Sequence, residues 1–122
     1  MTEKDLNKTA NLSSHVELGH GNLLDQGVMV GVGTKISSHG VIQSGCVVGA
    51  EVTIGNYVQI GSGSVISAGV TIEDEAFIGS GVTVVSGITI GKGARVGAGS
   101  VVIAPVKAGE TVFGNPAQPV KA

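Results

Sequence analysis

Residues 54–78 read IGNYVQ IGSGSV ISAGVT IEDEAF I, with an aliphatic residue at every sixth position. This frame runs without a slip from Ile54 to Val102, and it extends back to Leu6 and forward to Ala108. An α-helix repeats its apolar positions about every 3.6 residues and a half-buried strand repeats them at every second residue, so neither explains a period of six. The period indicates an internal repeat that includes nearly the whole chain.

Each six-residue unit predicts one short strand followed by one tight turn. Because strand side chains alternate, the aliphatic residue and the residue two positions before it point to the same side, which we take as the inside. The small, glycine-rich pair suits a turn, in which glycine adopts a positive φ without strain. Three strands and three turns would close a triangular coil of eighteen residues, so that residues eighteen apart stack; the sequence predicts an all-β prism of about six coils. We expect residues 1–5 to be a flexible N-terminal lead, residues 6–108 the β-helix and residues 109–122 a C-terminal loop or tail.

Composition limits the class of protein. The 122 residues suit one domain, and 42% hydrophobic residues, mostly valine and isoleucine, exclude a disordered chain. A net charge of −2 gives no reason to expect nucleic acid or a membrane surface as partner. The single cysteine, Cys46, falls at an inward position, which predicts a buried small residue rather than a reactive thiol. No stretch suits a signal peptide or a membrane span, so we expect a soluble protein in the cytoplasm.

The repeat and the end of the chain together resemble a known family. The pattern of an aliphatic residue, glycine and four further residues is followed by Val96-Gly-Ala-Gly-Ser-Val-Val102 and then by Gly114-Asn-Pro-Ala117. These stretches resemble the hexapeptide-repeat acyltransferase superfamily, and in particular its sugar N-acetyltransferases. The resemblance implies a left-handed parallel β-helix, assembly into a homotrimer, acetyl-CoA as the donor substrate and a sugar or amino sugar as the acceptor, with the site between subunits.

Because residues eighteen positions apart stack, the outward-pointing residues sort into an apolar face and a polar face of the prism. An exposed apolar strip usually marks an interface, so we expect the trimer contact there. The apolar face consists of Met29, Val47, Val65, Thr83 and Val101, with Val85 and Ile103 beside them. The polar face consists of Glu17, Lys35, Thr53, Thr71, Thr89 and Lys107.

One corner of the predicted prism, the serine corner, is lined by small residues and borders the apolar face. Such a groove could admit a slender pantetheine arm close to backbone amides, although serine and glycine also simply make good turns. The serine corner consists of Gln26, Ser44, Ser62, Ser80 and Ala98, each followed by glycine. In the resembling enzymes the last coils contact CoA, which implies a donor site at Ser80, Gly97, Ala98 and Asn115, with Lys107 and Lys121 as the nearby cations.

The corner on the other side of the apolar face, the alanine corner, consists of Ser14, Val32, Ala50, Ala68, Ser86 and Ala104. The resembling enzymes place a general-base histidine where this chain has Ala50, and a second histidine where it has Gln59. Neither replacement can take up a proton near neutral pH. His15 and Glu51 are the remaining histidine and acid on this corner, so we predict them as the catalytic pair; they lie two coils apart, about 10 Å by stacking.

The third corner, the mixed corner, points away from the apolar face and stacks His20, Ser38, Asn56, Asp74 and Lys92, with His39, Tyr57 and Glu75 alongside. A solvated edge explains this corner.

Two other functions stay open. Leu18-Gly-His-Gly21 resembles a segment of γ-class carbonic anhydrases, and three histidines would suit a catalytic zinc. The uninterrupted repeat and the missing histidine at position 50 also fit a trimeric scaffold without catalysis.

Overall fold

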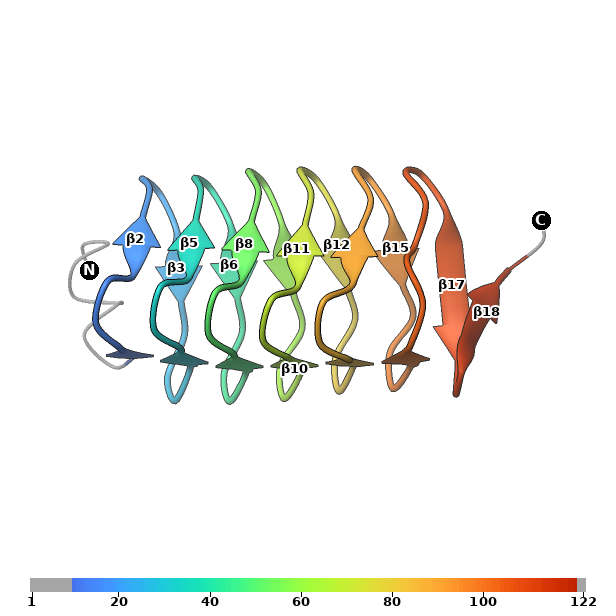
Figure 1. Ribbon diagram of the computed structural model, residues 1–122, viewed down its shortest axis with the longest axis horizontal. Helices are drawn as coiled ribbons and strands as arrows, with labels where there is room; N and C mark the ends of the chain where they lie inside the picture. The colour runs from blue at the N-terminus through green and yellow to red at the C-terminus, as the bar shows by residue number, and fades with distance from the viewer. Residues whose placement is uncertain (1–9, 121–122) are drawn as a thin grey trace.

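The structure is a computed structural model that describes residues 10–120, and in this range it consists of strands and turns (Figure 1). Most strands are two residues long, and they form three parallel sheets that we call A, B and C. The chain visits the sheets in the order A, B, C and returns to A, so that each circuit adds one strand to every sheet. The predicted lead at residues 1–5 and Leu6 lie outside the described residues.

The strands of each sheet follow one another along the axis of the prism. Sheet A contains β1 (Asn11–Leu12), β4 (Met29–Val30), β7 (Val47–Val48), β10 (Val65–Ile66), β13 (Thr83–Val84) and β16 (Val101–Val102). Sheet B contains β2 (Glu17–Leu18), β5 (Lys35–Ile36), β8 (Thr53–Ile54), β11 (Thr71–Ile72) and β14 (Thr89–Ile90). Sheet C contains β3 (Leu23–Leu24), β6 (Val41–Ile42), β9 (Gln59–Ile60), β12 (Phe77–Ile78), β15 (Arg95–Val96), β17 (Thr111–Gly114) and β18 (Ala117–Pro119).

The register confirms the eighteen-residue coil. Ile72 pairs with Ile54 on one side and with Ile90 on the other, and the same spacing holds in the other two sheets. The coils wind with a left hand, which makes the chain an exception to the usual right-handed crossover between parallel strands. The predicted fold class, an all-β left-handed parallel β-helix of about six coils, is therefore confirmed.

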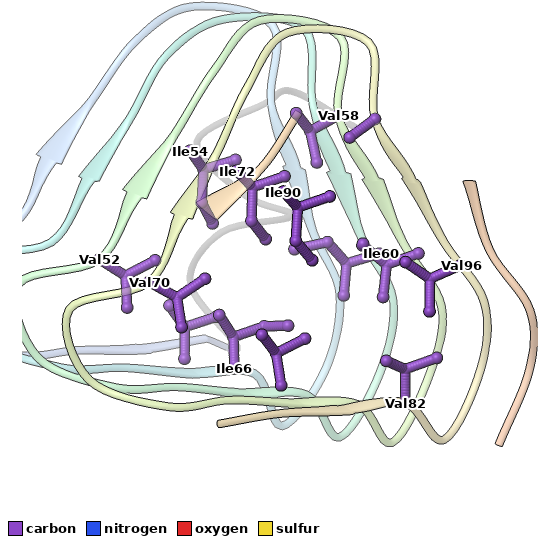
Figure 2. Close-up of a cluster of buried hydrophobic side chains, with 14 of the residues drawn as sticks. Val52, Ile54, Val58, Ile60, Ile66, Val70, Ile72, Val82, Ile90 and Val96 are labelled. Atoms are coloured by element: carbon purple, nitrogen blue, oxygen red, sulfur yellow. The ribbon is translucent and has the colours of Figure 1, made fainter. Parts of the chain in front are cut away.

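Columns of aliphatic side chains fill the prism. The second residue of every strand from β3 to β17 is buried, and Ile54, Ile72 and Ile90 form one stacked column (Figure 2). All three are at most 1% exposed. Burying an isoleucine contributes about 1.5–3 kcal/mol, so these columns are the main source of stability for a chain with so few large residues.

The inward position two residues before each of these aliphatic residues accepts a few polar side chains, all of them satisfied. Thr34 is fully buried; its Oγ1 donates to the carbonyl of Gly49 at 2.7 Å and accepts from the Val52 amide at 3.2 Å. Ser64 and Asn22 bridge neighbouring coils in the same way. No buried side-chain nitrogen or oxygen lacks a partner in the described part of the chain. These residues therefore tie one coil to the next without the cost of an unpaired polar group.

The last coil departs from the six-residue frame. Ile90 bridges to Val106 and Val96 pairs with Val112, so the partners here are sixteen residues apart rather than eighteen. Val106 is buried, whereas Ala108, which the frame places inward, is exposed. This coil is two residues shorter than the eighteen-residue repeat, and Val106, which is larger than Ala108, fills the interior. Sheet C continues beyond residue 108 through β17, and β18 folds back antiparallel to β17.

Replacing Ile72 with alanine tests the inner columns. We expect Ile72→Ala to lower the free energy of unfolding by about 2–5 kcal/mol, because the side chain is fully buried and leaves a cavity. Thr89→Ala, on the exposed side of the same sheet, should change it by no more than about 0.5 kcal/mol. Denaturant unfolding followed by circular dichroism gives both values, and equal effects would contradict the inward assignment.

Candidate functional site

The serine corner connects sheet C to sheet A and is smooth because neighbouring coils approach closely there. The amide of Gly99 donates to the carbonyl of Ser80 at 2.8 Å, which places Ser80 directly beside Ala98. A Cβ atom on Gly79 would lie 2.7 Å from the backbone nitrogen of Ala98. Only glycine fits at that approach, so the corner exposes backbone and the small side chains of Ser80 and Ala98.

The turn after β17 folds onto the end of this corner. The amide of Gly114 donates to Oγ of Ser100 at 3.0 Å, and this bond holds the turn that contains Asn115 against the last coil. The ring of Phe113 covers Gly97, where a Cβ atom would lie 2.5 Å from the ring. The structure thus gathers Ser80, Gly97, Ala98 and Asn115 at one end of the prism.

Phe113 belongs to this end of the serine corner and is 58% exposed. The six-residue repeat does not predict its place, because β17 follows the shortened coil and so lies outside the frame. Its only sequence signal is that it is one of the two phenylalanines of the chain and directly precedes Gly114-Asn-Pro-Ala117.

Lys107 does not join the predicted donor site. The shortened last coil places it against Gly91, and the next residues reach the mixed corner, where the Gly109 amide donates to the carbonyl of Lys92. Lys107 therefore neither continues the polar column of sheet B nor approaches Ala98. Lys121 lies outside the described residues.

The alanine corner connects sheet A to sheet B and carries His15 and Glu51, both exposed. Both residues have left-handed backbone conformations, with φ of 61° and 57°. Gly33 occupies the coil between them, and the carboxylate of Glu51 fills the space that a Cβ atom on Gly33 would need. The acid therefore leans over the coil that separates it from His15, and the two side chains form no ion pair. Ala50 lies at the same corner.

The mixed corner connects sheet B to sheet C and holds a ladder of side-chain hydrogen bonds. The His20 amide donates to Ser38 Oγ at 3.0 Å, and the Ser38 amide donates to Asn56 Oδ1 at 2.9 Å. His39 stacks on Tyr57 with ring centroids 5.1 Å apart. His15 lies on a different corner from these histidines, and residues 10–120 contain no group of three His, Cys, Asp or Glu side chains that could hold a metal. One subunit therefore does not assemble the zinc site of the carbonic anhydrase alternative.

The apolar face is the outer side of sheet A. Met29 is 53% exposed, Val47 41%, Val65 39% and Ile103 56%, while Val85 and Val101 are half-buried. The structure thus places the predicted residues on one face, between the alanine and serine corners. Their contact with another subunit stays a prediction.

Cys46 lies inside the prism. Its Sγ donates to the carbonyl of Gly61 at 3.0 Å, and burial raises the pKa of the thiol above its usual value. A buried, protonated thiol is a poor nucleophile, which agrees with its interpretation as a small core residue. Separately, residues 10–120 contain no helix that could cross a membrane.

Two family models match the repeat. Bacterial transferase hexapeptide (six repeats) matches residues 69–104, and hexapeptide repeat of succinyl-transferase matches residues 41–72. No curated protein sequence matches the chain.

Solved structures match nearly the whole chain. PerB from Caulobacter crescentus, in complex with CoA and GDP-perosamine, is 32% identical with a TM-score of 0.91, over 93% of this chain and 55% of that one. The acetyltransferase domain of PglB from Neisseria gonorrhoeae, in complex with acetyl coenzyme A, is 27% identical with a TM-score of 0.88, over 92% and 55%. AntD, an N-acyltransferase from Bacillus cereus, is 18% identical with a TM-score of 0.89, over 94% and 77%, and shares the fold.

The fold and its repeat define a left-handed parallel β-helix protein built from hexapeptides. The chain belongs to the hexapeptide-repeat acyltransferase superfamily. It spans about half the length of PerB and of the PglB chain.

Proposed function

We propose that this protein is a CoA-dependent acyltransferase that acetylates an amino sugar at a site between the subunits of a homotrimer. The likeness to PerB carries the proposal, because it extends over 93% of the chain and the PerB structure holds both CoA and a sugar nucleotide. The PglB domain, which holds acetyl coenzyme A, supports the same donor.

The serine corner suits the donor. Its surface of backbone, Ser80 and Ala98 leaves room for the narrow pantetheine arm, and the Asn115 turn closes one end of it. Phe113 offers an exposed aromatic ring beside Gly97, against which an apolar part of the donor could pack. Because Lys107 lies elsewhere, it does not serve the CoA phosphates of the same subunit.

The alanine corner suits the acceptor. In the reaction the amine nitrogen attacks the thioester carbonyl, an amide C–N bond forms, the C–S bond breaks and CoA leaves as a thiol. The amine must also lose a proton, which a neutral imidazole can accept. His15 is the histidine at this corner, and the Glu51 carboxylate, which lies over Gly33 on the coil between them, would stabilise the imidazolium that forms.

Trimer assembly would bring the two halves of the site together. The alanine and serine corners lie on opposite edges of sheet A, so one subunit does not complete the site. In a ring with threefold symmetry each contact is heterologous, so the alanine corner of one subunit would meet the serine corner of its neighbour. The exposed apolar residues of sheet A give such a contact its hydrophobic interior.

A non-catalytic trimeric scaffold is the second candidate. Ala50 and Gln59 favour it, because they stand where the resembling enzymes carry histidines. Donor binding and turnover distinguish the two candidates.

Calorimetric titration with acetyl-CoA tests the donor site. We expect saturable binding at one site per subunit, and desulfo-CoA should bind while ATP should not. Ala98→Trp should weaken binding at least tenfold, about 1.4 kcal/mol, because the new side chain would fill the serine corner. Thr89→Trp on sheet B is the matched control and should bind normally. If millimolar acetyl-CoA gives no heat in the parent protein, the donor site does not exist.

Introducing a charge on the apolar face tests the trimer. We expect Val65→Glu to convert a trimer to monomers, because burying three carboxylates at the contact is unfavourable. Thr53→Glu on sheet B should keep the parental mass. Light scattering measures both variants; a trimeric Val65→Glu protein would mean that the contact lies on another face.

Removal of the imidazole tests the base. We expect His15→Ala to lower turnover at least a hundredfold with amino-sugar acceptors, while acetyl-CoA still binds with parental affinity. His39→Ala, on the mixed corner, should keep full turnover. Thiol release from acetyl-CoA follows the reaction. Full activity in His15→Ala would rule out this base, and a parent protein that binds acetyl-CoA but never turns over would favour the scaffold.

A further inference from the structure

A hollow of about 190 Å³ lies on the outer side of sheet C, next to the mixed corner. It is separate from the alanine corner, which joins the other two sheets. Its lining residues do not include those gathered around Ala98, although Gln59 and Phe77 also line the neighbouring hollow that contains Ser80. Its walls come from β9, β12 and β15 and from the turns that precede these three strands. The side chains that matter for its chemistry are Tyr57, Gln59, Glu75, Phe77 and Arg95.

Two of the chain's three aromatic side chains other than histidine line this hollow. Tyr57 is 60% exposed and Phe77 is 41% exposed, so both rings present apolar surface to solvent. His39 stacks on Tyr57 with an angle of 21° between the rings, and this contact fixes the orientation of the phenol. The hollow therefore has an ordered aromatic wall before any ligand arrives.

The backbone under these side chains is strained. His39, Tyr57 and Glu75 occupy successive coils with φ of 62°, 58° and 64°. At the serine corner, the equivalent left-handed position of the turn is glycine in every coil from Gly27 to Gly99. A left-handed conformation costs a residue with a Cβ about 1–2 kcal/mol. Since glycine would fold more easily here, the side chains point to a role in binding rather than in folding.

The charged side chains around the hollow have opposite signs. The Arg95 guanidinium lies 5.5 Å from the centre of the Phe77 ring and forms no ion pair within the described residues. Glu75 pairs with Lys92 at 3.8 Å, with both side chains largely exposed. Hydrogen-bond donors and acceptors thus surround an aromatic wall without a net positive charge. A phosphate in the hollow would meet the carboxylate of Glu75, which disfavours a nucleotide.

We propose that this hollow binds a pyranose ring of a saccharide. The apolar face of the sugar would pack on Tyr57, and its hydroxyl groups would bond to Arg95, Glu75 and Gln59. The site goes beyond the proposed acetyl transfer, because it lies on the outward side of the prism and needs neither the donor nor the apolar face. It would hold a glycan at the surface of the protein.

Tyrosine fluorescence tests the site directly, because Tyr57 is the only tyrosine and the chain has no tryptophan. We expect methyl glycosides of glucose, galactose, mannose or N-acetylglucosamine to give a saturable change. Phe77→Ala and Arg95→Ala, which both retain Tyr57, should weaken the binding at least tenfold. Thr89→Ala on sheet B is the control and should bind as the parent does. Circular dichroism and thermal unfolding confirm that each variant is folded.

Three results would overturn the proposal. The first is the absence of any response to the glycosides up to their solubility, and the second is a response to adenosine diphosphate alone. The third is parental binding by both variants. Acetyl-CoA titration of Arg95→Ala distinguishes the two proposals, because Arg95 lines the saccharide hollow and not the hollow that contains Ser80. Unchanged donor affinity in this variant supports a separate site, whereas failure of the parent to bind acetyl-CoA counts against acetyl transfer and leaves the saccharide result intact.

Discussion

The structure depends on one constraint, the parallel stacking of coils in strict register. Most strands have two residues, too few to form a stable sheet alone, and their backbone groups pair with the coils before and after them. The same stacking buries the isoleucine and valine columns. Every inward position must therefore be aliphatic or satisfied by a hydrogen bond to the next coil, as Thr34 is, and a close approach of two coils such as that at Gly79 requires glycine.

The corners are where this constraint leaves freedom, and the protein uses each of them differently. At the serine corner glycine takes the left-handed position throughout, and the surface is small and smooth. At the mixed corner larger residues occupy that position in three successive coils, and they build an aromatic and charged edge. At the alanine corner this position is glycine in some coils and a larger residue in others. Gly33 there makes room for the Glu51 carboxylate. Differences in surface chemistry thus arise from one position in the repeat.

Sheet A explains why assembly and function are linked in our proposal. It carries the exposed apolar residues, and it separates the corner with His15 and Glu51 from the corner with Ser80 and Ala98. Acyl transfer needs donor, acceptor and base within bonding distance, which a rigid prism with these groups on opposite edges does not achieve within one subunit. The saccharide hollow on sheet C faces away from that contact, so it stays accessible in a trimer formed through sheet A.

The sequence by itself determined the coil, its three faces, the inward residues and the grouping of Ser80 with Ala98, because a fixed period makes residues eighteen apart neighbours. Only the tertiary structure decided what breaks that period. The shortened last coil moves Val106 inward and carries Lys107 away from the donor corner, and the parallel pairing of β17 with β15 places Phe113 over Gly97. The hollow between Tyr57, Phe77 and Arg95, and the reach of Glu51 over Gly33, depend on side-chain directions across neighbouring coils. A repeat specifies which backbones stack, whereas the contacts of exposed side chains follow from their rotamers, which periodicity does not encode.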